Sequence, residues 1–236
     1  MYSSLRDFVY ADHSIDWTIA LILDNESWLR KKEKESGQAP APDPEASLWK
    51  EAYRLQQAGD REGARVRLRA LLSLPGIESR STLNAWRALR DLGEQPEPRV
   101  AHQVLGVVFE IVDDEGPSPF LATAAAFARG SPRYFASTGA GVIGEGMAEE
   151  VENLGKDLLA AGTPFANRFK PELKHGLPHG RDMLRFALLT PAGVLAVQRP
   201  LDKVEQDGLA AFAMAGDRLI AGLVDEAARE SKPGRP

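Results

Sequence analysis

The chain has 236 residues, a formal net charge of −5 and no cysteine, which excludes disulfide bonds, cysteine-ligated zinc and cysteine nucleophiles. Hydrophobic residues make up 43% and charged residues 27%, values typical of a globular fold. The first residues lack the pattern of a signal peptide, and no apolar run approaches the roughly 20 residues that span a bilayer. We therefore expect a cytoplasmic protein without membrane association, and the acidic net charge argues against nucleic acid as a partner.

Residues 14–35 have the spacing of an amphipathic helix. Apolar side chains such as Ile15 and Ile19 recur there at intervals of three or four residues. Residues 37–46 then carry three prolines at alternate positions, which cannot continue a helix. The sequence thus predicts an N-terminal helix within residues 1–36, followed by an extended, proline-rich linker.

Residues 47–95 predict a helical unit. Gly59 and Asp60 interrupt its apolar periodicity once, Pro75 and the glycine after it interrupt it again, and Gly93 ends the third helix. This segment carries 9 Lys and Arg against 6 Asp and Glu, a net charge of +3. The middle of an otherwise acidic chain is therefore locally basic.

One part of this helical unit follows a family pattern. The positions that carry it are Leu48, Ala52, Leu55, Gly59, Asp60, Ala64, Leu68 and Leu72. This pattern over residues 47–75 resembles a tetratricopeptide helical hairpin, and the Gly-Asp turn with alanine four residues after the aspartate is its most typical part. The resemblance covers about one repeat, with the closing proline one residue early and a leucine in place of the usual tyrosine. It implies a surface that binds a partner.

Three arginines lie on one face of the second helix of this hairpin. Arg61, Arg65 and Arg69 follow one another at intervals of four residues, which places them in a row. Such a row suits an acidic protein partner or RNA. It also suits a solvated face that keeps the helix soluble, which is the simpler interpretation. We retain the three arginines as the candidate partner-binding residues.

After a second linker near residues 94–98, the periodicity changes from helical to extended. The expected strands are 104–112, 120–127, 133–137, 141–144, 183–190 and 194–198, and the expected helices are 147–162 and 202–229. Short hairpin connections favour an antiparallel arrangement. We therefore predict an α+β domain over residues 99–230, with a mainly antiparallel sheet of four or five strands and two helices on one of its faces.

Residues Gly139–Gly144 spell the G-x-G-x-x-G pattern of dinucleotide-binding sites. The expected helix begins after the third glycine, so these glycines would not lie at its N-terminus. No second strand that ends in an acidic residue follows at the required distance. A hairpin turn explains the glycines better, and we predict no cofactor.

Residues 163–180 form a long segment rich in proline, glycine and histidine. His175 and His179 are four residues apart, as in a helical metal site, but the glycine and proline between them disfavour a helix. We predict a solvated loop without a metal ion. Long loops are often functional, so His175, His179 and Arg181 are the candidate ligand-binding residues of this loop.

No set of residues in the sequence forms a coherent catalytic motif. The hairpin and the arginine row favour a non-catalytic adaptor of bacterial type, a composition rich in Ala, Arg and Gly being typical of GC-rich bacterial genomes. Its expected partner is a protein, an acidic one if the arginines bind it, and homodimerisation stays open. The alternative is a small-molecule-binding sensor or an enzyme that uses the 163–181 loop.

Overall fold

The chain folds into two compact units. The computed structural model describes residues 10, 14–36, 43–113, 120–172, 180 and 182–230. The helical unit is Ala11–Pro96, and the sheet unit combines Glu97–Pro236 with the N-terminal segment Met1–Tyr10. The helical unit is therefore an insertion, because the chain belongs to the sheet unit both before and after it.

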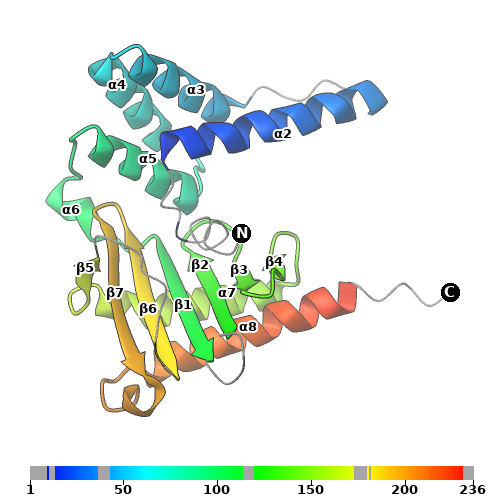
Figure 1. Ribbon diagram of the computed structural model, residues 1–236, viewed down its shortest axis with the longest axis vertical. Helices are drawn as coiled ribbons and strands as arrows, with labels where there is room; N and C mark the ends of the chain where they lie inside the picture. The colour runs from blue at the N-terminus through cyan, green and yellow to red at the C-terminus, as the bar shows by residue number, and fades with distance from the viewer. Residues whose placement is uncertain are drawn as a thin grey trace. The chain divides into compact units, whose positions relative to one another are not determined.

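The described residues of the helical unit form four helices around one core (Figure 1). They are α2 (Ile15–Ser36), α3 (Pro44–Gln57), α4 (Arg61–Leu72) and α5 (Ser79–Asp91). Large buried side chains from three of them, Trp49, Leu68 and Leu89, form the centre of this core. Ile15 and Ile19 add the apolar face of α2 to it.

The α3–α4 hairpin is fixed by the chemistry of its turn. Gly59 has a φ of +81°, a left-handed conformation that glycine adopts at little cost. The Asp60 side chain then accepts a hydrogen bond of 2.8 Å from the backbone N–H of Gly63 and caps α4. The likeness of this hairpin to a tetratricopeptide repeat stays a prediction.

In the sheet unit, the described residues form seven antiparallel strands in the order β4-β3-β2-β1-β6-β7-β5 (Figure 1). Their bounds are β1 Gly106–Asp113, β2 Phe120–Phe127, β3 Arg133–Ala136, β4 Gly141–Ile143, β5 Lys170–Glu172, β6 Met183–Thr190 and β7 Gly193–Pro200. A four-residue helix, α6 (Pro98–Ala101), precedes the first strand. The predicted α+β class is confirmed.

The predicted count of four or five strands was too low. One strand that the sequence did not indicate is β5, which lies in the segment expected to be an irregular loop. Its sequence, Lys-Pro-Glu, contains no β-branched or aromatic residue. Only pairing with β7 makes this segment extended, and that pairing is a long-range effect.

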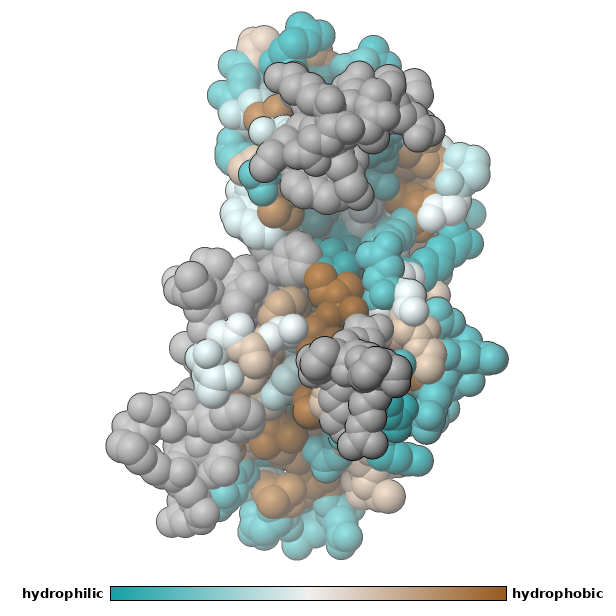
Figure 2. All heavy atoms as spheres, turned by 90° about the vertical axis from the view of Figure 1, so that its right-hand side faces the viewer, coloured by the Kyte–Doolittle hydropathy of each residue, from teal (hydrophilic) through white to brown (hydrophobic). Residues whose placement is uncertain are grey.

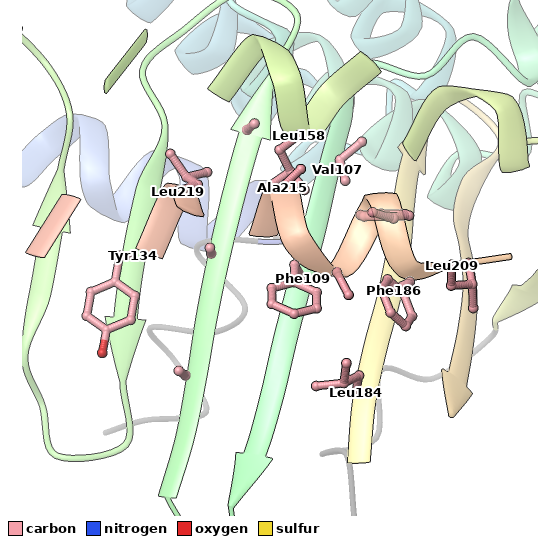
Figure 3. Packing of buried hydrophobic residues seen from close by; sticks show 14 of the residues in the cluster. Val107, Phe109, Tyr134, Leu158, Leu184, Phe186, Leu209, Ala215 and Leu219 are labelled. Carbon is pink, nitrogen blue, oxygen red and sulfur yellow. The ribbon is translucent and has the colours of Figure 1, made fainter. Parts of the chain in front are cut away.

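Two helices, α7 (Glu149–Gly162) and α8 (Ala210–Glu230), cover one face of the sheet. Figure 3 shows side chains of the strands, among them Phe109 and Phe186, packed with residues of these helices.

The expected helix 202–229 begins only at Ala210. Two short 3-10 turns, η1 (Thr163–Phe165) and η2 (Leu201–Lys203), precede β5 and α8, and Gly208, with a φ of +71°, is incompatible with an earlier start of α8.

A glycine sets the distance between α8 and the sheet. A Cβ atom on Gly216 would lie 2.1 Å from Cδ1 of the buried Phe109 ring. On the same helix, a Cβ atom on Gly222 would meet only the end of the flexible Leu154 side chain, at 2.5 Å. Close approach of the α8 backbone to β1 therefore depends on Gly216.

We expect Gly216→Ala to be less stable than the matched variant Gly222→Ala by about 1–3 kcal/mol, the usual cost of overpacking a core. Both changes gain the same helix propensity, so their difference reports packing alone. Urea denaturation of the two variants measures it. Equal free energies of unfolding would contradict a tight contact between α8 and Phe109.

Candidate functional site

The face of the sheet opposite α7 and α8 carries a cluster of buried polar side chains. Side chains alternate along a strand, so Glu110 and Arg185 point away from the helices that their neighbours Phe109 and Phe186 contact. Glu110 pairs in register with Thr123 on β2 and with Arg185 on β6. All three polar side chains are buried.

Both oxygens of the Glu110 carboxylate accept hydrogen bonds. The Thr123 hydroxyl donates to Oε1 at 3.1 Å, and the Tyr10 hydroxyl donates to Oε2 at 2.7 Å. Arg185 Nε lies 3.5 Å from Oε2, and the same guanidinium forms an ion pair with Glu172. A buried carboxylate requires such partners, because its desolvation would otherwise cost several kcal/mol.

Tyr10 is held in this cluster in two ways. Besides its hydrogen bond, its ring lies against the Arg185 guanidinium, whose central carbon is 5.3 Å from the ring centroid. Tyr10 precedes the helical unit directly in the chain. The cluster thus anchors the point at which the chain leaves the sheet unit.

The Tyr10 cluster, meaning Tyr10, Glu110, Thr123, Glu172 and Arg185, favours a structural role over catalysis. A general base needs a carboxylate oxygen that can reach a substrate proton, and both oxygens of Glu110 already have donors. Sequence reasoning missed these residues. The one available signal was a single glutamate inside the apolar run of residues 104–112.

The predicted arginine row is largely engaged within its own unit. Arg65 forms an ion pair of 3.0 Å with Glu62 and also donates to a backbone carbonyl. Arg69 lies 2.7 Å from Glu94 and 3.4 Å from Glu62, and hydrogen bonding to Glu94 raises the pKa of Arg69. Arg61 is exposed, and its side chain has no hydrogen bond or ion pair with any described residue. Binding of an acidic partner by this row stays a prediction.

The candidate loop residues His175, His179 and Arg181 lie outside the described part of the chain. The described part of their loop, at Arg168 and the residue after it, borders a pocket of about 110 Å³. Its lining residues are Arg168, Phe169, Val197, Arg199, Asp207 and Leu209. The pocket is smaller than the 300 Å³ or so typical of ligand sites.

Both arginines of this small pocket are bonded to the same aspartate. Arg168 donates to the Asp207 carbonyl at 3.0 Å, and Arg199 Nε lies 2.5 Å from the Asp207 carboxylate. These contacts hold the turn before α8 against the strands.

A larger pocket of about 300 Å³ lies between α7 and the β2–β3 connection. Its lining residues are Ala126, Phe127, Ala128, Gly130, Ser131, Pro132, Glu152, Gly155 and Lys156. Glu152 and Lys156 bring opposite charges to its rim, and Lys156 donates to the Asn153 side chain at 3.0 Å. Among these lining residues, the Ser131 hydroxyl has no hydrogen bond to Glu152 or Lys156, as a nucleophile would have to its base.

The G-x-G-x-x-G segment forms the turn and the second strand of the β3–β4 hairpin. Gly139 lies in the turn with a φ of +89°, and α7 begins five residues after Gly144. A dinucleotide site would need the glycines at the helix N-terminus. Over residues 14–36, 43–113, 120–172 and 182–230, no three His, Cys, Asp or Glu side chains are grouped as metal ligands would be.

No family model, curated protein or solved structure matches this chain. Among the helices of the described residues, none combines the length and apolar character that a membrane crossing requires.

We expect Tyr10→Phe to destabilise the protein by about 1–3 kcal/mol, because it leaves a buried carboxylate oxygen without its donor. Tyr53→Phe is the matched control, since the hydroxyl of this half-buried tyrosine has no hydrogen bond to a described residue. Denaturant unfolding followed by far-UV circular dichroism compares them, because it reports on both units, whereas all four tryptophans lie in the helical unit. The anchoring role fails if both variants unfold at the wild-type midpoint.

Proposed function

We propose that this protein is a non-catalytic interaction protein whose helical unit binds another protein through α2. The observation that supports this proposal is that α2 is apolar on more than its packed face. Ile15, Ile19 and Ile22 lie on the core of the helical unit. Leu21 and Leu23 of the same helix are 41% and 49% exposed.

These two leucines lie on different sides of α2. At about 100° per residue they point some 160° apart, one on each flank of the packed face. Single exposed leucines are common on protein surfaces. A surface helix with apolar residues on several sides is expected to be covered by something else. Burial of each leucine by a partner would contribute about 1.5–3 kcal/mol.

The charges near these leucines indicate the chemistry of the partner. Asp16 and Asp24 are exposed on α2, so the apolar residues have acidic neighbours. A partner for α2 would therefore present an apolar anchor with basic residues around it. The positively charged Arg61 on α4 would instead suit a partner with acidic residues. The two surfaces of the helical unit thus predict partners of opposite charge and can be tested separately.

We expect the double variant Leu21→Glu/Leu23→Glu to lose a partner that wild-type protein captures, because buried glutamates oppose docking of an apolar anchor. Tagged full-length proteins would be compared by quantitative mass spectrometry of captured proteins. Val66→Glu on α4 is the control, since Val66 is 47% exposed and lies outside α2.

A captured protein that is retained by Val66→Glu and lost by the double variant supports docking on α2. Identical captured proteins for all three samples would contradict it. Circular dichroism of each variant shows whether the helical unit remains folded.

The alternative function is small-molecule binding or catalysis at the 163–181 loop. The pocket beside Arg168 favours it, since the described part of that loop lines a hollow in the sheet unit. A compound that raises the melting temperature of the wild type but not of His175→Ala/His179→Ala would support this alternative. The small volume of this pocket and the bonds of Arg168 and Arg199 to Asp207 argue against this alternative.

A further inference from the structure

The strand β4 forms one edge of the sheet, and some of its backbone groups have no strand partner among the described residues. Gly144 N–H donates to the Pro132 carbonyl at 2.9 Å, and Ala136 N–H donates to the Ala140 carbonyl at 2.8 Å. Hydrogen-bonded pairs alternate along an antiparallel ladder, so Val142 is the residue of β4 that bonds to β3. The N–H and C=O groups of Gly141 and Ile143 therefore point outward.

The two edge strands of the sheet differ in how well they are protected against pairing with a further strand. The edge strand β5 reads Lys170-Pro171-Glu172, and charges and proline are the usual means of blocking an edge. The edge strand β4 reads Gly-Val-Ile and carries neither. Gly141 is exposed, and Ile143 is 42% exposed. An unprotected, apolar edge of this kind is a template for another strand.

We propose that β4 pairs antiparallel with β4 of a second copy of this chain, about a twofold axis that passes beside Val142. In this register Gly141 of one copy lies opposite Ile143 of the other, and the same pair repeats across the axis, as an isologous interface requires. Each such pair exchanges two backbone hydrogen bonds through the outward groups. The sheets of the two copies become one continuous sheet.

The side chains of β4 are self-complementary in this register. Gly141 has no side chain because the Phe135 ring occupies that space, 2.6 Å from where its Cβ would lie. The absent side chain leaves room for Ile143 of the other copy, which would cover the edge of that ring. A bulky residue at position 141 would clash with the Phe135 ring and with Ile143 of the other copy.

On the face of the sheet that α8 covers, apolar side chains near β4 add to the surface that a second copy would bury. Val142 and Ile220 of α8 are partly exposed side chains packed on the core, and Val224 of α8 is 42% exposed. In the proposed pairing, the two copies of Val142 face one another as a non-hydrogen-bonded pair with closely spaced side chains. Figure 2 shows hydrophobic residues, in brown, exposed among hydrophilic ones on the sheet unit.

A strand of a different protein could add to the same edge. The second copy is favoured because one short segment supplies both the isoleucine and the glycine that it meets. This pairing is independent of α2, so the two proposals can fail separately.

The test is sedimentation equilibrium of the full chain over a concentration series. Wild type is expected to form a dimer of the 25.7 kDa chain. Ile143→Pro removes an outward N–H without touching the ladder to β3, and Ile143→Lys places a charge on the edge. Both variants are expected to sediment as monomers, while the control Ile143→Val remains dimeric.

Far-UV circular dichroism and thermal unfolding establish that the monomeric variants are folded. A wild type that is monomeric at every concentration up to hundreds of micromolar overturns the proposal. So does a dimer that persists in both Ile143→Pro and Ile143→Lys. A dimer that is lost in Leu21→Glu/Leu23→Glu but kept in Ile143→Lys would place the interface on α2 and reject β4.

Discussion

Burial of the Glu110 carboxylate constrains the whole sheet unit. A charge at the centre of a sheet is tolerated only where its neighbours supply hydrogen-bond donors and an opposite charge. β2 supplies Thr123, β6 supplies Arg185, and the N-terminal segment supplies Tyr10. A one-residue slip of either strand would turn its polar partner towards the apolar core. The cluster therefore fixes the register of the three central strands together with the position of Tyr10.

The sequence predicted correctly those elements whose conformation is determined by residues close together in the chain. The helix α7 follows from apolar spacing and acids in its first turn, and the β3–β4 hairpin follows from its glycines. The start of α8 was set too early because the turn before it depends on contacts of Asp207 with Arg168 and Arg199. β5 was missed for the same reason, since only β7 makes it a strand.

The Tyr10 cluster shows even more clearly that contacts between residues far apart in the chain cannot be predicted from sequence spacing. Glu110 meets a threonine 13 residues away and a tyrosine 100 residues away, and no periodicity in the sequence relates them. The arginine row illustrates a different limit of local spacing. Its spacing is local and was visible, but Glu94, which pairs with Arg69, follows it by 25 residues. A row of charges in sequence does not reveal which charges are already neutralised.

The insertion of the helical unit between Tyr10 and Glu97 has a consequence for biosynthesis. The helical unit depends on contacts within its own stretch of chain, so it can fold on the ribosome as soon as it has emerged. Tyr10 is synthesised before it, yet has no binding site until β1 and β6 exist. Closing so long a loop gives the sheet unit a high contact order and slow formation. Until then, an already folded helical unit separates Tyr10 in the nascent chain from its place on the sheet.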